Sequence, residues 1–547
     1  MSDWWRDAVI YQVYPRSWAD ADGDGIGDLR GIAARLPHLV ELGVDAVWFS
    51  PFYRSPQHDA GYDVADYRDV DPVFGTLADV DAVLREAAEL GIKVIVDLVP
   101  NHTSSEHPWF REALASPPGS PARERYVFRD GKGPDGAQPP NDWRSVFGGQ
   151  AWTRLTGPDG APEQWYLHLF DTTQPDLNWE HPQVRAEFES IIDFWLDRGV
   201  AGFRVDVAHS LVKAEGLPDF PDAPAVVAGS VEQAPYFDQD GVHEIYRRWR
   251  ALLDARGEPA RIMCAEAWVT PAERAARYIR PDEFHQAFNF DILECPWRAE
   301  HLRTTIADSL AATSSVGASA TWVLSNHDVV RHASRLGLPP GTPRPQGIGP
   351  GDPRPDPVAG LARARAATLL VLSLPGAAYL YQGEELGLPE AMNLPPEVRQ
   401  DPIFERSGGT DAGRDGCRVP MAWEADAPAL GFSPSGASWL PQPHEYRDLA
   451  VDRQRGVAGT TYEMYRAALR IRRETGLGSA AITPLDLGPD VVAYEHACPD
   501  GVVLGVTNLG AEPVDLPDGE VLLRSDTGTA QGPAHVGTDV TVWVRRE

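Results

Sequence analysis

The sequence predicts an α/β protein built on a closed (β/α)8 TIM barrel, with a small domain inserted after the third strand and an antiparallel β domain at the C-terminus. Short apolar runs of strand length alternate with amphipathic helical stretches, which is typical of βα units and parallel sheets. Eight such runs occur, the number that closes a barrel of this kind. A doubly wound sheet is the weaker alternative.

The predicted strands are short and mostly apolar at consecutive positions, as expected for strands buried on both faces. Between two of them, Val80, Val83, Leu84, Ala87 and Leu90 recur at the spacing of one helix face. The strands begin, in chain order, at Val9, Val44, Ile92, Gly202, Arg261, Ala287, Ser319 and Ala377.

The βα alternation is interrupted by three long segments. Residues 104–172 are rich in Pro, Gly and aromatic residues, and two further stretches run from Gly337 and over about residues 388–442. Long loops of this kind usually line an active site. After residue 475 the apolar pattern changes to period two, which predicts an antiparallel β-sandwich. We expect the barrel at 1–103 and 173–475, an inserted domain at 104–172 and a C-terminal domain at 476–547.

Charge and composition narrow the class of partner. The chain has 547 residues and a formal net charge of −31, which repels nucleic acid and anionic membrane surfaces. No apolar run reaches the ~18–20 residues of a membrane helix, and the start has no signal-peptide pattern. Four scattered cysteines without a CxxC pair disfavour zinc and a disulfide framework. We expect a cytoplasmic monomer or homodimer that acts on a small molecule.

Polar side chains follow the C-terminal ends of four predicted strands, where a barrel of this kind carries its active site. Paired carboxylates without a Ser-His or metal-ligand pattern suit cleavage of a glycosidic bond, for which one must be ionised and the other protonated. These residues are His102 after the third strand, Arg204 and Asp206 at the fourth, Glu266 after the fifth, and His327 and Asp328 after the seventh.

The charge of Arg204 is expected to act on Asp206. The two residues are two positions apart on one strand and therefore share a face, so the guanidinium favours the ionised carboxylate. Glu266 must instead be protonated, which the negative charges of Asp206 and Asp328 favour.

The stretch DADGDGIGD, Asp20 to Asp28, predicts a cation site. Its first six residues match the opening of an EF-hand calcium loop, but the position of the closing bidentate Glu is Gly31. We expect a hard cation, Ca²⁺ or Mg²⁺, bound in a fold other than an EF-hand; a solvated acidic turn is the alternative.

The runs DLVPNH, QPDLN, GFRVDVAHS, AEAW and SNHDVVR, in this order, resemble the motif set of the α-amylase family, glycoside hydrolase family 13. The resemblance spans nearly the whole chain. The segments DAGYDVADY, YQGEELG and GRDGCRVPMAW resemble the branch of α-glucosidases and oligo-1,6-glucosidases more than the endo-acting amylases.

The resemblance implies a role for each matching residue. Asp206 would be the nucleophile, Glu266 the acid and then base, and Asp328 the third carboxylate, which binds sugar hydroxyls in the distorted state. The same glucose would be bound by His102, His327 and Arg204, by Tyr62 stacked on its apolar face, and by Asp59 with Arg414 as an end wall; Arg418 is the alternative to Arg414.

The resemblance also implies a structural cation, usually Ca²⁺, in the loop after the first strand, away from the reacting bond. The matching ligands are Asp20, Asp22, Asp24, the carbonyl of Ile26, and Asp28.

The implied activity is that of an exo-acting retaining α-glucosidase on short oligosaccharides, with maltose-type α-1,4 bonds favoured. Val207, directly after the nucleophile, goes with α-1,6 substrates in part of the family, so an oligo-1,6-glucosidase is an alternative. A second alternative is a transglucosylase or an isomerase of sucrose, trehalose or maltose. A remote third is a non-catalytic partner protein.

Overall fold

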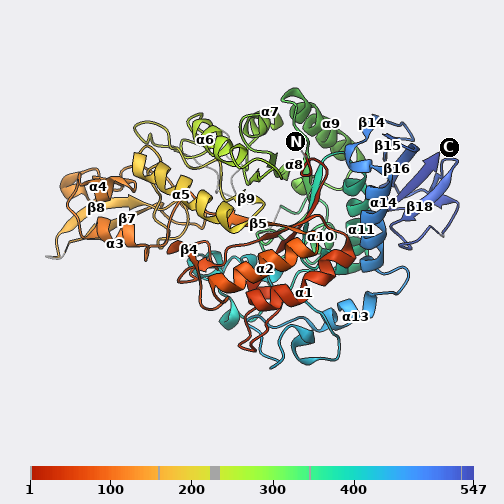
Figure 1. Ribbon diagram of the computed structural model, residues 1–547, viewed down its shortest axis with the longest axis horizontal. Helices are drawn as coiled ribbons and strands as arrows, with labels where there is room; N and C mark the ends of the chain where they lie inside the picture. The colour runs from red at the N-terminus through yellow and green to blue at the C-terminus, as the bar shows by residue number, and fades with distance from the viewer. Residues whose placement is uncertain (1–2, 158–159, 222–233, 344–345, 531, 547) are drawn as a thin grey trace.

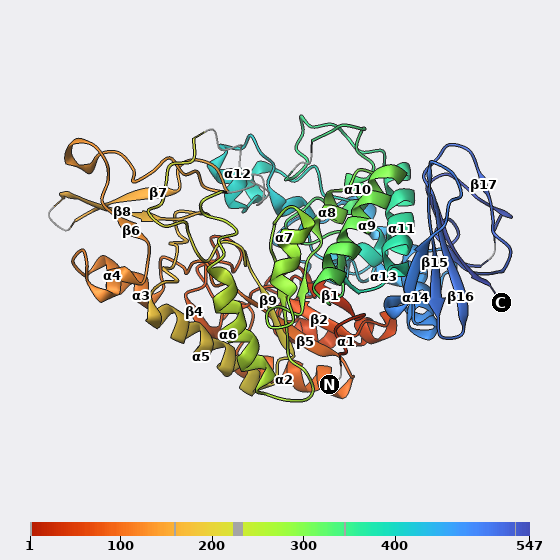
Figure 2. The same cartoon turned by 90° about the horizontal axis from the view of Figure 1, so that it is seen from above.

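The computed structural model describes residues 3–157, 160–221, 234–343, 346–530 and 532–546. In Figures 1 and 2 the strands β7 (Trp152–Thr156) and β8 (Pro162–Leu167) lie at one end of the molecule. Strands β15 (Val491–Cys498) and β16 (Gly501–Asn508) lie at the opposite end, beside the C-terminus. The parallel sheet lies between them.

An eight-stranded parallel sheet forms the centre of the fold. Its order is β11-β10-β9-β5-β2-β1-β13-β12, and a parallel bridge between Asn289 and Trp322 joins the two ends of this series. The predicted barrel is therefore confirmed. Its strands are β1 (Val9–Val13), β2 (Ala46–Phe49), β5 (Lys93–Leu98), β9 (Gly202–Val205), β10 (Ile262–Ala265), β11 (Gln286–Ala287), β12 (Thr321–Val323) and β13 (Ala377–Tyr381).

The sixth predicted strand is largely wrong. Only Gln286–Ala287 pairs as β11, and Phe290–Glu294 forms the short helix α8. The side chain of Asn289 accepts a hydrogen bond from the backbone N–H of Ile292 at 3.1 Å, which is the geometry of a helix N-cap. The apolar run that suggested a strand thus belongs to a capped helical turn.

Amphipathic helices follow the strands. Helix α2 (Leu77–Glu89) begins with a capping box of Thr76 and Asp79 and buries Val80, Val83, Leu84 and Ala87, whereas Leu90 lies just beyond its end and is exposed. None of the helices in the described ranges is both long and apolar enough to cross a membrane. The other long helices are α1 (Leu29–Leu42), α5 (Pro182–Arg198), α6 (Val242–Asp254), α9 (Ala299–Ser315), α11 (Pro357–Ser373) and α14 (Thr461–Thr475).

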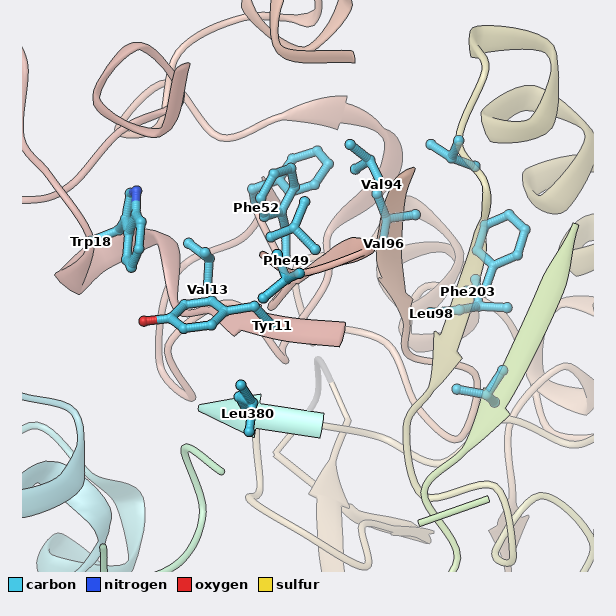
Figure 3. Packing of buried hydrophobic residues seen from close by; sticks show 14 of the residues in the cluster. Tyr11, Val13, Trp18, Phe49, Phe52, Val94, Val96, Leu98, Phe203 and Leu380 are labelled. Carbon is cyan, nitrogen blue, oxygen red and sulfur yellow. The ribbon is translucent and has the colours of Figure 1, made fainter. Parts of the chain in front are cut away.

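The barrel strands contribute side chains to a continuous buried cluster. Figure 3 shows side chains of this cluster along neighbouring strands, from Tyr11 and Val13 of β1 past Phe49 of β2 and Val96 of β5 to Phe203 of β9. Each of these side chains is at most 2% exposed. Packing of this kind fixes the strand ends, which carry the polar residues of the site.

Two antiparallel units accompany the barrel. Strands β6 (Phe128–Arg129), β8 and β7 form a three-stranded sheet within predicted residues 104–172. The C-terminal unit has a five-stranded sheet of order β14-β15-β16-β20-β18 and a two-stranded sheet β17-β19. Its remaining strands are β14 (Ala481–Pro484), β17 (Val514–Asp515), β18 (Glu520–Arg524), β19 (His535–Val536) and β20 (Val540–Arg546). The three domain boundaries remain predictions.

The remaining elements are short and lie mostly in the connections. These elements are β3 (Tyr53–Arg54), β4 (Asp66–Val70), α3 (Pro108–Leu114), α4 (Pro121–Glu124), α7 (Ala272–Ala276), α10 (His332–Arg335), α12 (Pro402–Arg406) and α13 (Val451–Gln454).

Part of the predicted loop from Gly337, residues 344–345, lies outside the described residues.

Gly202 is required where β9 and β10 approach each other. A Cβ atom at this position would lie 2.2 Å from the carbonyl oxygen of Ile262, so Gly202→Ala must push the two strands apart. We expect it to lower the free energy of unfolding by about 1–3 kcal/mol or more, measured by urea denaturation. Gly351→Ala is the control, because nothing lies within 4 Å of the added atom. Equal stability of the two variants would contradict this account of the barrel.

Candidate active site

A cavity opens at the C-terminal ends of the barrel strands. Asp206 directly follows β9 and Glu266 directly follows β10. Of the nine predicted catalytic and sugar-binding residues, Arg204 and His327 lie behind the cavity wall. The other seven line it, namely Asp59, Tyr62, His102, Asp206, Glu266, Asp328 and Arg414.

Arg204 is the cation at the base of the site. Its side chain is 1% exposed, and its Nη1 lies 3.0 Å from Oδ1 of Asp97 and 2.7 Å from Oδ1 of Asp206. Its Nη2 lies 2.7 Å from Oε2 of Glu266. Arg204 thus contacts Asp206, as expected, and the same guanidinium also contacts Glu266 and a third acid, Asp97.

Burial opposes ionisation of these acids, and Arg204 counteracts it. Burial raises the pKa of Asp206 well above its usual range, Arg204 lowers it, and the charges of Glu266 and Asp97 raise it further. Burial likewise raises the pKa of Asp97 to about 7 against the effect of Arg204. A positive charge that develops beside Asp206 would lower the pKa of its carboxyl group further, as Arg204 does.

Glu266 is held by three donors. Oε2 accepts the backbone N–H of Val207 at 3.0 Å in addition to the contact with Arg204. Oε1 accepts the indole N–H of Trp268 at 3.1 Å. Val207 has φ of +41°, which is strained for a β-branched residue and directs its N–H toward the acid.

Asp328 lies between two arginines and a histidine. Its Oδ1 is 2.9 Å from Nη1 of Arg414 and 2.9 Å from Nη2 of Arg418, and its Oδ2 is 3.2 Å from Nε2 of His327. Although burial opposes ionisation, these partners lower the pKa of Asp328 below its usual range. The two guanidinium groups thus favour the ionised form of Asp328 on the cavity wall.

Arg414 closes one end of the cavity. Its Nη2 lies 2.8 Å from Oδ1 of Asp59, and its Nε lies 2.8 Å from Oδ2 of Asp401. Burial raises the pKa of Asp59 to about 6, against the lowering effect of Arg414 and Arg418. Arg418 is buried behind this wall, so the structure places Arg414 rather than Arg418 on the cavity.

Tyr62 and the two predicted histidines form a packed group. The rings of Tyr62 and His327 are stacked at 5.2 Å with an angle of 7°, and Nε2 of His102 lies 3.1 Å from the carbonyl oxygen of Tyr62. Burial lowers the pKa of His102 to about 4 and that of His327 well below its usual range. Both imidazoles are therefore neutral near pH 7, and their contact with a sugar remains a prediction.

The structure adds residues that the sequence prediction missed. Asp97, Gln174 and Trp268 lie inside the motifs DLVPNH, QPDLN and AEAW but are not among the predicted site residues; they contact Arg204, Asp59 and Glu266, respectively. Asp401 lies in the long segment over residues 388–442, where no motif marks it. The cavity is also lined by apolar residues, including Val146, Phe147, Phe170, Phe237 and Ile403.

A buried ammonium in the loop after β9 contacts the segment after β5 and the segment before α5. Nζ of Lys213 lies 2.7 Å from Oδ2 of Asp176, 2.8 Å from Oδ1 of Asn101 and 2.5 Å from the carbonyl oxygen of Ser210. These three oxygens come from three segments, so one side chain holds the three segments together.

The acidic loop brings together three of its four predicted aspartates. Ligand oxygens of Asp20, Asp22 and Asp28 all lie within 4.8 Å of one another, and Asp24 is not part of this group. Backbone N–H groups already bind some of the oxygens, because Asp20 accepts from Gly23 and Gly25 and Asp28 from Ala21. Carboxylate oxygens of this kind fit a hard cation such as Ca²⁺.

A family model described as the alpha-amylase catalytic domain matches residues 12–478. The chain belongs to the α-amylase family. A probable alpha-glucosidase from Rhizobium meliloti is 42% identical to it, over 86% of this chain and 83% of that one. An oligo-1,6-glucosidase from Parageobacillus thermoglucosidasius is 35% identical, over 90% of this chain and 88% of that protein.

Solved structures of the same architecture are similar to this α-amylase-family chain over its whole length. The crystal structure of an alpha-glucosyl transfer enzyme, XgtA, superposes with a TM-score of 0.84 at 38% identity and covers 100% of both chains. The trehalulose synthase MutB from Pseudomonas mesoacidophila superposes with a TM-score of 0.83 at 31% identity, over 99% of each chain.

Lys213→Met should destabilise the protein, because it leaves Asp176 buried without its cation. We expect the free energy of unfolding to fall by about 3–5 kcal/mol, as measured by urea denaturation. Lys132→Met is the control, since the ammonium of Lys132 is half exposed, 3.0 Å from Asp219, and such a pair contributes at most about 1 kcal/mol. If Lys213→Met lowers the free energy of unfolding no more than the control does, the buried ion pair does not hold these three segments together.

Proposed function

We propose that the chain is an exo-acting retaining α-glucosidase that removes glucose from the non-reducing end of short α-glucosides. The observation that carries this proposal is the pair of contacts made by Arg204, which holds Asp206 and Glu266 at the base of one cavity. Two carboxyl groups close together on opposite sides of one glycosidic bond are what a retaining mechanism requires.

In the first half-reaction Asp206 attacks the anomeric carbon. The C–O bond to the leaving group breaks, and Glu266 gives its proton to the departing oxygen, so that a covalent glucosyl-enzyme forms. Positive charge develops on the sugar ring as this bond breaks. This positive charge then favours the ionised form of Asp206, which burial alone disfavours.

In the second half-reaction Glu266 takes a proton from water. The oxygen of that water attacks the anomeric carbon, the bond to Asp206 breaks, and glucose leaves as the α anomer. Asp328, whose ionised form is favoured by Arg414 and Arg418, supports the positively charged ring in both steps.

The closed end of the cavity supports action at chain ends. The ion pair between Arg414 and Asp59, buttressed by Asp401, forms a wall next to Asp328. A glucose that occupies this end has no room for a further unit beyond it. The enzyme is accordingly assigned exo activity.

We favour maltose-type α-1,4 bonds. One relative is named Maltase 1, from Drosophila virilis, at 35% identity over 90% of this chain, and another is named an oligo-1,6-glucosidase. Val207, which lines the cavity, keeps the α-1,6 alternative open. We also propose that the enzyme acts in the cytoplasm as a monomer or homodimer, consistent with four unpaired cysteines.

Glucosyl transfer is the second candidate function. Water and a sugar hydroxyl compete for the same glucosyl-enzyme, and several apolar side chains line the cavity. The similarity over the whole chain to an alpha-glucosyl transfer enzyme also favours it.

A time course of products from maltose, isomaltose, sucrose and trehalose tests both functions. We expect maltose to be cleaved fastest, with α-glucose as the first product, followed by NMR spectroscopy. Accumulation of a new glucoside before free glucose would favour transfer. Release of β-glucose, or no reaction with any of the four, would overturn the proposed function.

We propose that Asp20, Asp22 and Asp28, together with Asp24 and the carbonyl of Ile26, bind a structural Ca²⁺, or Mg²⁺ in its place. The cation would neutralise three carboxylates held within 4.8 Å. The loop leads from β1 into α1, and Asp28 is the N-cap of that helix. None of these residues lines the cavity, so the cation would support the loop and take no part in bond cleavage.

Removal of divalent cations should therefore lower the melting temperature more than the rate. A cation at 100 times its Kd contributes about 2.7 kcal/mol to stability, so EDTA should lower the melting temperature by several degrees while the initial rate at 20 °C, on an aryl α-glucoside, changes little. Asp22→Asn should have a lower melting temperature that EDTA no longer changes. Immediate loss of activity with the fold intact, or a melting temperature indifferent to EDTA and Ca²⁺, would refute the structural cation.

A further inference from the structure

We propose that the indole N–H of Trp268 is a positioning group that makes Glu266 a better acid. The inference rests on the proposed role of Glu266 as the proton donor. Trp268 lies two residues after Glu266 in the segment AEAW and lines the same cavity. Neither the proposed mechanism nor the predicted set of site residues includes it.

The hydrogen bonds to Glu266 decide which of its oxygens carries the proton. Oε2 lies 2.7 Å from Nη2 of Arg204 and accepts the backbone N–H of Val207. An oxygen at which a guanidinium and an amide both point their hydrogens has no room for a proton of its own. The transferred proton therefore sits on Oε1, the oxygen that accepts the indole N–H at 3.1 Å.

The indole is held in place from its ring face. Trp268 and Phe290 are stacked at 3.6 Å with an angle of 2°, and Trp268 is 8% exposed. Phe290 begins helix α8, the segment that replaces most of the predicted sixth strand. That short helix thus fixes the plane of the indole and, through it, the orientation of the carboxyl group of Glu266.

The hydrogen bond from Trp268 strengthens while the proton leaves. Before transfer its acceptor is a neutral carboxyl oxygen, and after transfer it is a carboxylate oxygen, to which hydrogen bonds are roughly twice as strong. An interaction that grows along the reaction lowers the barrier. The effect is largest for leaving groups that need a full proton, such as the hydroxyl of a sugar, and small for acidic phenols.

Two substitutions distinguish the effect of the N–H donor of Trp268 from the effect of its stacked ring. Trp268→Phe keeps an aromatic face against Phe290 and loses the N–H. Trp268→His loses most of the stacked area, and its Nε2–H can occupy the place of the indole N–H. The measurement is kcat/KM for maltose and for aryl α-glucosides whose phenols range from acidic to weakly acidic, with Glu266→Gln as the reference for lost acid catalysis.

We expect Trp268→Phe to lower kcat/KM about tenfold for maltose and the poorest phenols, the factor that one hydrogen bond supplies, and less than about threefold for 4-nitrophenyl α-glucoside. Trp268→His should show the same dependence of kcat/KM on the leaving group as the unchanged enzyme. Equal losses across the substrates in Trp268→Phe, or the same selective loss in Trp268→His, would overturn the proposal. Should Trp268→Phe not fold, Trp268→Leu supplies the variant without a donor.

The reference variant distinguishes this inference from the proposed function. Glu266→Gln must show the steepest dependence on the leaving group if Glu266 is the acid. If Glu266→Gln lowers kcat/KM equally for all substrates, Glu266 is not the acid, and the proposed function fails together with the role of Trp268.

Discussion

The buried guanidinium of Arg204 is the interaction on which the site depends. One cation contacts Asp97, Asp206 and Glu266 at the base of the cavity. Taking three carboxyl groups out of water is costly unless a fixed charge accompanies them, and an arginine stays protonated in any such environment. Arg204 therefore allows the nucleophile and the acid to face the same sugar. Burial still raises the pKa of Asp206 well above its usual range, so positive charge on an oxocarbenium-like ring favours the ionised nucleophile.

Much of the fold and of the site could be predicted because both follow from periodicity and from strand ends. Consecutive apolar residues marked seven of the eight barrel strands, and the polar residues directly after those strands, such as Asp206 and Glu266, reach the cavity because the ends of parallel strands meet at one edge. The exception was the run from Ala287, where Asn289 caps a helix. A local hydrogen bond there outweighs the apolar pattern.

The remaining features depend on contacts between distant segments, which no local pattern reveals. Asp401 contacts Arg414 within the long segment over residues 388–442, and Lys213, in the loop after β9, contacts Asp176 in another segment. Sequence alone could not choose between Arg414 and Arg418, because both contact Asp328 and only burial separates them. The strain at Val207 and the stacking of Trp268 on Phe290 likewise arise only when the strands have closed into a barrel.

The central claim is that Asp206 forms a covalent bond to glucose while Glu266, beside it on the same guanidinium, moves the proton. Trapping with 5-fluoro-α-glucosyl fluoride, followed by digestion and peptide mass spectrometry, tests this most directly, because the fluorine slows release of the intermediate. The account predicts one added fluoroglucosyl group, located on Asp206. A label on Glu266 or Asp328, or rapid turnover with no covalent adduct at any time, would contradict it.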